Sequence, residues 1–303
     1  MSSQLAIFSH VAIDAVRLPG SKGITEAVGG AGAYAAVGAA LASTDGGDPL
    51  LVAGVGETQR LFFEKWCGDR GIASGALFRV PYSVPITLVE YRDEQNRREI
   101  PLLGLKHFED ATPLPNRVTD AQFDDVTYAF VFHDEDPEFW RQMRDWSERV
   151  GVKVGWELSL DACKSSKLAA VKDISSGCEV IFLNLEESEL LLGTHDEEQI
   201  SKAFSEFETT VVLHDASRPV RVWSHGEYFE VPVVRGVNAI DPTGGGNSFC
   251  GAILERLKTG DDLRAAVEYG CAVAAFVVSV RGVPVNDSEN VKCIRAMRAT
   301  LTQ

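Results

Sequence analysis

Three consecutive glycines next to an amide side chain are the residues of this sequence most suited to chemistry. The stretch 241–249 reads Asp-Pro-Thr-Gly-Gly-Gly-Asn-Ser-Phe and lies between a predicted strand and a helical pattern. Glycines at a helix start leave backbone N–H groups uncovered, and the helix dipole adds positive potential there. The spacing therefore predicts an anion site at Gly244, Gly245 and Gly246, although a tight turn alone would also use glycines.

The overall charge argues against two classes of partner. The 303 residues carry a formal net charge of −15, and an acidic surface repels phosphate backbones and anionic lipid. We therefore expect neither nucleic acid nor a membrane as the main partner. The longest apolar runs, such as 272–278, are too short to span a bilayer.

The amino-terminal residues and the cysteines predict a cytoplasmic protein. The start of the chain lacks the basic and long apolar regions of a signal peptide. Six cysteines are scattered without a C-x-x-C pair, which disfavours a zinc site and fits free thiols in a reducing compartment.

The elements that must position the glycine stretch alternate between apolar strands and amphipathic helices. We expect helices near 33–41, 61–66 (buried through Leu61, Phe62 and Trp66), 138–150 and 249–257, the last closed by Gly260. Such alternation favours a parallel sheet with crossover helices. The predicted sheet strands are 5–13, 50–55, 129–132, 152–154, 180–183 and 211–213.

Two segments differ from this pattern. Residues 86–92 and 98–103 mix apolar and charged residues around a predicted turn at 93–96, which indicates a hairpin with one polar face. Residues 220–234 also alternate, with a turn at His225-Gly226. We expect one domain over 1–303 with a small β lid formed by about 14–28 and 79–106. The edge strands of that lid could pair with a second copy in a homodimer.

Several motifs in one order resemble the pfkB carbohydrate kinases. The stretch 241–249 is similar to that family's carboxy-terminal signature D-T-x-G-A-G-D-x-F, and 29–34 to its G-G-x-x-x-N region. Asn184 and Glu187 match its N-x-x-E, 55–57 and 71–72 its G-x-D…G-V stretch, and 265–282 its alanine-rich terminal helix. The resemblance covers roughly 5–285. It implies a ribokinase-like, three-layer α/β/α fold with a mainly parallel central sheet.

The resemblance also implies an activity: transfer of the ATP γ-phosphate to a hydroxyl of a sugar, nucleoside or related small molecule. By analogy, Asp14, Gly30 and Tyr34 would contact the acceptor, and the three glycines would form the anion hole. Asn184 and Glu187 would face the phosphates, with Glu187 ordering Mg²⁺ through water, and Asp241 would bind a monovalent cation such as K⁺. Each also has a structural interpretation: Asp14 and Asp241 as turn residues, Asn184 and Glu187 as a helix cap.

Three departures from the family pattern touch three subsites. Asn247 stands at the catalytic aspartate, and an amide cannot take up a hydroxyl proton at neutral pH. His214 to Pro219 replaces the T-x-G-x-x-G segment near the nucleotide, and Asp215 adds negative charge there. Tyr34 replaces an asparagine that contacts the acceptor, and its bulk would reshape the pocket.

Three hypotheses therefore stay open. The first is an ATP- and Mg²⁺-dependent kinase slowed by Asn247, because loss of a general base costs about 10² to 10⁴ in rate. The second is a pseudokinase that binds a metabolite or a protein without chemistry. The third is a reuse of the anion hole and pocket for a different reaction.

Overall fold

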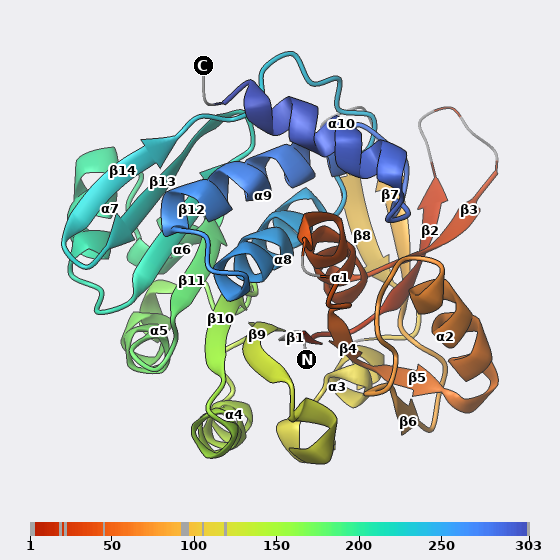
Figure 1. Ribbon diagram of the computed structural model, residues 1–303. Coiled ribbons are helices and arrows are strands. Elements are labelled where there is room, and N and C mark those ends of the chain that lie inside the picture. Colours follow the sequence, from red (N-terminus) through yellow and green to blue (C-terminus); the bar gives the residue numbers. More distant parts are fainter. Residues whose placement is uncertain are drawn as a thin grey trace.

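The computed structural model describes residues 4–17, 20, 23–44, 46–91, 97–104, 106–117 and 120–301. Its centre is an eight-stranded sheet in the order β14-β13-β12-β11-β10-β9-β1-β4 (Figure 1). The six strands β12, β11, β10, β9, β1 and β4 are parallel to one another, and β13 and β14 are joined to β12 by antiparallel pairing. The mainly parallel sheet is as predicted. Its strands are β1 Gln4–Phe8, β4 Leu50–Val52, β9 Val126–His133, β10 Lys153–Leu158, β11 Val180–Asn184, β12 Thr210–Asp215, β13 Arg218–Ser224 and β14 Glu227–Val231.

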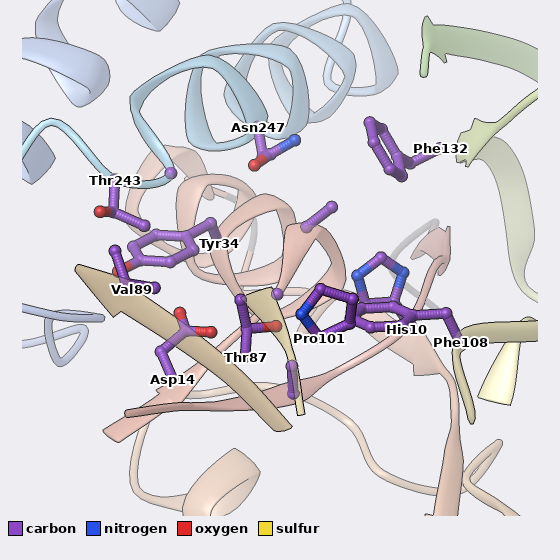
Figure 2. Close-up of a pocket in the computed structure, with 14 residues that line it drawn as sticks. His10, Asp14, Tyr34, Thr87, Val89, Pro101, Phe108, Phe132, Thr243 and Asn247 are labelled. Carbon is purple, nitrogen blue, oxygen red and sulfur yellow. The ribbon is translucent and has the colours of Figure 1, made fainter. Parts of the chain in front are cut away.

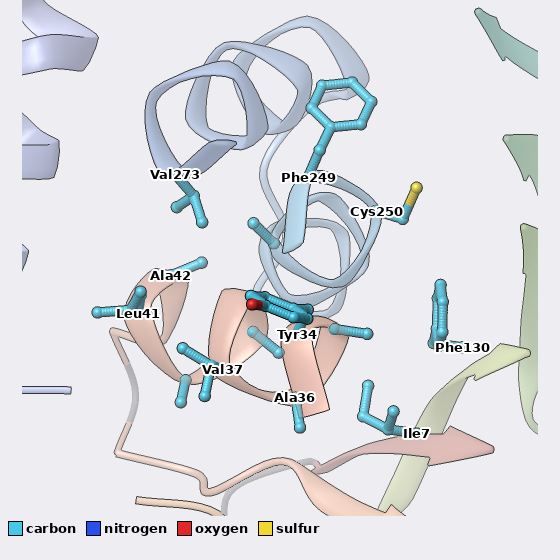
Figure 3. Close-up of a cluster of buried hydrophobic side chains, with 14 of the residues drawn as sticks. Ile7, Tyr34, Ala36, Val37, Leu41, Ala42, Phe130, Phe249, Cys250 and Val273 are labelled. Carbon is cyan, nitrogen blue, oxygen red and sulfur yellow. The ribbon is translucent and has the colours of Figure 1, made fainter. Parts of the chain in front are cut away.

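Helices cover both faces of this sheet, which confirms the three-layer α/β/α fold. Alternate strand residues face opposite layers: Phe130 packs with α1, α8 and α9, whereas Val131 packs with α4 to α7. Figure 3 shows the first layer, with Tyr34 and Val37 of α1 beneath Phe249 of α8. The helices are α1 Ala31–Ala42, α2 Arg60–Gly68, α3 Lys106–Ala111, α4 Pro137–Val150, α5 Leu168–Ser175, α6 Leu185–Leu192, α7 Glu197–Ser205, α8 Gly245–Lys258, α9 Leu263–Val278 and α10 Ser288–Ala299. None of the helices in the described part of the chain is long and apolar enough to cross a bilayer.

A second, four-stranded sheet has the order β3-β2-β7-β8. The hairpin expected at 86–103 is confirmed as the antiparallel pair β7–β8, while its turn at 93–96 lies outside the described residues. Asp14, Thr87 and Pro101 stand in one register row across three strands. The interpretation of this sheet as a lid, and pairing with a second copy through its edges, stay predictions. The strands are β2 Ala12–Arg17, β3 Thr25–Gly29, β7 Ile86–Tyr91 and β8 Arg97–Pro101.

Two predicted strands were wrong in the same way. Residues 5–13 form β1 and β2, and residues 50–55 form β4 and the start of β5 (Gly54–Gly56), which pairs with β6 (Phe78–Val80). In both cases the apolar run continues while the chain passes from one sheet to another. Ser9 still donates to Val52 of the central sheet, whereas Ile13 donates to Pro85 beside the second. Hydrophobic pattern alone cannot mark such a crossing, because both sides are buried.

The buried face of α2 also differs from the prediction. Leu61 and Phe62, expected to be buried, are 80% and 53% exposed, and Phe63, Trp66 and Cys67 are the residues that pack inward. A 3.6-residue period allows either face when apolar residues occur on both.

Backbone contact between α1 and α8 sets the position of the glycine stretch. A Cβ on Gly251 would lie 2.1 Å from the Ala35 carbonyl oxygen, and one on Gly38 would lie 2.2 Å from the Ser248 carbonyl oxygen. The two helices therefore touch through their main chains at two successive points. This contact fixes the start of α8 against the start of α1.

Replacing Gly251 by Ala should separate these helices. The added methyl group meets backbone that cannot rotate away, so we expect a loss of at least about 2 kcal/mol of unfolding free energy by urea denaturation. The matched control is Gly68→Ala at the end of α2, where an added Cβ meets nothing within 4 Å, and which should be neutral or slightly stabilising. Equal stability of the two variants would contradict the backbone contact.

Candidate active site

The glycine stretch makes a left-handed turn into α8. Gly244 caps the helix at φ +74°, without a side-chain cap, and a Cβ there would lie 2.0 Å from the ring of Tyr34. Gly245 would meet Val278 at 2.9 Å and Gly246 would meet His214 at 3.2 Å. Only glycine fits at 244, for both its conformation and its contact.

The first turn of α8 leaves backbone donors without helical acceptors. The earliest intrahelical bond runs from the Ser248 N–H to the Gly244 carbonyl at 2.9 Å, and the Gly245 N–H reaches Pro242 only at 3.5 Å. Within the described residues, no backbone acceptor is in range of the Gly246 or Asn247 N–H. These N–H groups and the positive end of the helix dipole suit an anion. The anion hole remains a prediction that this geometry permits.

A cavity of about 370 Å³ lies beside this turn (Figure 2). It brings together five residues singled out from the sequence: Asp14, Gly30, Tyr34, Gly244 and Asn247. One wall comes from the starts of α1 and α8, and the opposite wall from β2, β7 and β8. Other lining residues come from segments that the sequence also indicated: Ala31, Thr243 and, in the predicted lid, Thr87, Val89 and Pro101. The sequence did not indicate the other lining residues, which are His10, Ala12, Phe108 and Phe132.

Asp14 lies in the middle of β2, and not at the end of a strand as expected. Its carboxylate packs on the backbone of Gly29 in the neighbouring strand, where a Cβ would lie 1.8 Å from Oδ2. Gly30, at φ +86°, then turns the chain into α1. Glycine at 29 therefore makes the room in which the Asp14 carboxylate faces the cavity.

Three rings form an aromatic side of the cavity. His10 lies edge-on to Phe108 at 5.0 Å and to Phe132 at 6.1 Å between ring centroids. Burial lowers the pKa of His10 to about 4, helped by His133, so the imidazole is neutral at pH 7. Position in the sequence could have indicated two of these rings. His10 and Phe132 come at the carboxyl ends of parallel strands, where α/β proteins place ligands.

Asn247 is held from behind by Glu157, which the sequence did not indicate. The Asn247 Nδ2 atom donates to both carboxylate oxygens of Glu157, each at 2.9 Å. Glu157 is 7% exposed, and burial raises its pKa to about 8 against the hydrogen bond from Asn247. The signal that could have found it is a lone acid within the apolar strand β10, because buried acids cluster at functional sites.

Asn184 and Glu187 close the start of α6 in a reciprocal capping box. The Glu187 N–H donates to Asn184 Oδ1 at 2.9 Å, and the Asn184 N–H donates to Glu187 Oε2 at 2.8 Å. Burial raises the pKa of Glu187 to about 7, and the nearby Glu186 adds to the rise. The helix-cap interpretation is thus confirmed, while phosphate and Mg²⁺ roles for the pair stay predictions.

Asp241 holds the loop before α8. Its Oδ1 accepts the Thr243 N–H at 3.0 Å and its Oδ2 the Gly282 N–H at 3.2 Å. These bonds confirm the turn interpretation. Within the described residues, no three His, Cys, Asp or Glu side chains are grouped so that they could hold a metal ion.

The segment from His214 to Pro219 is a tight hairpin and not an open loop. β12 and β13 are joined through Ala216, at φ +41°, and Ser217. Asp215 pairs with Arg218 at 3.2 Å, so its charge is partly compensated. His214 points inward, tilted against Phe249 at 5.5 Å, and burial lowers its pKa to about 4.

Residues 2–289 match the sequence profile described as pfkB family carbohydrate kinase. The chain belongs to this family. That Asn247 stands at the catalytic aspartate of the family stays a prediction, whereas the contact of its amide with Glu157 is part of the structure.

Individual relatives are distant. The chain is 28% identical over 120 residues to a 2-dehydro-3-deoxygluconokinase of Thermoproteus tenax, covering 39% of this chain but only 36% of that protein. It is 24% identical to a cytidine kinase of Thermococcus kodakarensis over 92% of this chain and 97% of that protein. The fold superposes on a fructokinase with bound ATP from Xylella fastidiosa with TM-score 0.76 and 19% identity, covering 98% and 99% of the two chains.

The buried Glu157 should make stability depend on pH. In the unfolded chain this acid ionises near 4.5, whereas in the fold its pKa is about 8. Between these values the folded state keeps a proton that the unfolded state releases, so stability falls as pH rises. Glu157→Gln removes this term.

We therefore expect Glu157→Gln to gain stability relative to wild type as the pH rises. From pH 5 to pH 9 its unfolding free energy should increase, relative to that of wild type, by about a few kcal/mol. Urea denaturation at each pH measures it. The exposed Glu198→Gln in α7 is the control and should show no such trend. A constant difference for Glu157→Gln would mean that Glu157 ionises normally in the fold.

Proposed function

We propose that this pfkB chain is an ATP- and Mg²⁺-dependent phosphotransferase that acts on a hydroxyl of a small molecule. The observation that carries the proposal is the arrangement of one cavity. The uncapped start of α8 faces it from one side and the Asp14 carboxylate from the other. An acceptor hydroxyl and the phosphoryl group that it receives would fit between these two groups.

The chemistry assigned to the site consists of positioning and charge stabilisation. The acceptor oxygen forms a bond to the γ-phosphorus, the bond from that phosphorus to the bridging oxygen of ADP breaks, and the hydroxyl proton passes to an oxygen of the transferred group. Asn247 cannot take that proton, but it can orient the hydroxyl. Because phosphoryl transfer has a loose transition state, catalysis survives loss of the base at a lower rate.

The residues present fit a nucleotide with Mg²⁺, which when bound supplies neutralisation of phosphate charge. Mg²⁺ keeps several waters and binds through few protein ligands. Glu187 would order that water, next to Asn184 and His214. Asp241 would bind a monovalent cation such as K⁺ through its carboxylate.

The aromatic side of the cavity supports an acceptor with a flat ring. His10 is neutral, and with Phe108 and Phe132 it offers ring surface and few charges. Flat heteroaromatic groups pack on such rings, edge-on or offset. A nucleoside fits this wall better than a free sugar does, and the similarity to a cytidine kinase points the same way.

One observation favours a second candidate, a pseudokinase. An amide at 247 with an acid of raised pKa behind it provides no ionised base at neutral pH. Such a site could bind acceptor and nucleotide without transfer. Measured turnover separates the two candidates.

The test is calorimetric binding of Mg-ATP, followed by transfer of labelled γ-phosphate to a panel of nucleosides and sugars. We expect Mg-ATP binding and slow transfer to a nucleoside. Asp14→Asn should lower acceptor kcat/KM by about 10²-fold, because a charged hydrogen bond is lost, and should leave Mg-ATP affinity unchanged. Glu26→Gln, an exposed acid on the adjacent strand β3, is the control.

Two results would overturn the proposal differently. Absence of Mg-ATP binding at millimolar nucleotide removes the phosphotransferase altogether. Binding of both ligands without any transfer leaves the pseudokinase.

A further inference from the structure

Glu157 has surroundings unlike those of an ordinary buried acid. The groups that face it are the Asn247 amide, the Cys250 thiol and the Glu187 carboxyl. The His214 ring lies beside Gly246, as does Glu157 itself. None of these is a cation at neutral pH, since burial also lowers the pKa of His214 to about 4. The Asn247 amide is thus the main polar partner of the Glu157 carboxylate.

The amide is oriented by this contact. In Figure 2 the Asn247 oxygen lies on the side of Tyr34 and the nitrogen on the side of Phe132. A carboxylate only accepts hydrogen bonds, so it selects the amide nitrogen and rejects the oxygen. With the nitrogen bound twice at 2.9 Å, the oxygen is left to face the cavity.

We propose that Glu157 is the positioning residue of this site: its carboxylate holds the Asn247 amide so that Oδ1 accepts the hydrogen bond of the acceptor hydroxyl. The part that concerns the acceptor rests on the proposed function, whereas the orientation of the amide does not. Glu157 itself does not line the cavity and acts through Asn247.

Protonation weakens this hold. A protonated Glu157 has one oxygen that donates and so accepts from Nδ2 at one oxygen only, and its O–H group can also bond the flipped amide through Oδ1. The orientation of Asn247 should therefore be fixed at higher pH and mixed at lower pH. The acceptor should bind more tightly as Glu157 ionises.

The same contact bears on the variant Asn247→Asp. Two carboxyl groups at hydrogen-bond distance share one proton, because both cannot ionise together. The buried Glu157, whose pKa is about 8, keeps that proton, so the aspartate at the cavity ionises and supplies a base. In the double variant Glu157→Gln with Asn247→Asp the amide and the acid exchange places. The aspartate can then ionise while the glutamine nitrogen holds it.

The orientation is testable without turnover. Uniformly ¹⁵N-labelled protein is titrated from pH 6.5 to 9.5, and the side-chain amide resonance of Asn247 is assigned by its loss in Asn247→Asp. We expect this resonance to shift with a midpoint near 8, the pKa of Glu157, and the shift to vanish in Glu157→Gln. The control resonance is Asn290, whose amide donates to the Val285 carbonyl at 3.0 Å and should not move.

Kinetics provide the second readout. Glu157→Gln should raise acceptor KM about tenfold, equivalent to one modest hydrogen bond, with nucleotide KM unchanged and without the wild-type pH dependence near 8. Asn247→Asp should raise kcat above that of wild type by about 10²-fold or more, because it supplies a base, and the double variant should keep this gain.

An Asn247 resonance that does not titrate, or that titrates equally in Glu157→Gln, would overturn the proposal whether or not the protein is a kinase. If Glu157→Gln does not fold, the wild-type titration still decides, and Glu157→Asp serves as a second variant. In Glu157→Asp the shorter acid should still shift the Asn247 resonance with pH, but by a smaller amount than in wild type. A shift as large as that of wild type would also contradict the proposed contact.

Discussion

Main-chain contact between α1 and α8 is the constraint on which the site depends. Both helices begin at the cavity, with Gly30 before one and Gly244 before the other. They can begin there together only because glycines let their backbones touch further along, at Gly38 and Gly251. A side chain at either position would move the starts of α1 and α8 apart and widen the cavity between them.

Burial without nearby cations determines the charge of the acids behind the start of α8. Glu157 and Glu187 both lose ionisation to burial, so the region behind the start of α8 carries less negative charge than its composition suggests. This matters for the proposed phosphate site, because two ionised carboxylates there would oppose an anion. The hydrogen bond from Asn247 partly restores the ionised form of Glu157, so the amide and the acid adjust each other.

Much of this arrangement was predictable from the sequence. The glycine stretch, Asn247, Asp14, Gly30 and Tyr34 were singled out, and the structure brings them to one cavity. The order of motifs that resemble the pfkB kinases identified the fold and these residues, while strand–helix alternation, a local signal, indicated the parallel sheet.

The parts that sequence missed depend on contacts between distant segments. The sequence marks Glu157 only as a lone acid within an apolar strand, and its contact with Asn247 depends on β10 lying beside α8. The crossing of the chain at Ser9 to Val11 is invisible to hydrophobic pattern, because the chain is largely buried from the end of β1 to the start of β2. Leu61 and Phe62 were misplaced because apolar residues on α2 fit either face. Asn184 and Glu187 were found, and their reciprocal bonds show the structural role of this motif as a helix cap.

The crossing between sheets has a mechanical consequence. Asp14 belongs to β2 of the smaller sheet, and Asn247 to a helix packed on the larger one. The packing within either sheet therefore leaves the separation of these two side chains undetermined. Their separation depends on how the two sheets are joined: at His10, where the chain passes from β1 to β2, and at Gly29, where Asp14 packs beside the start of α1.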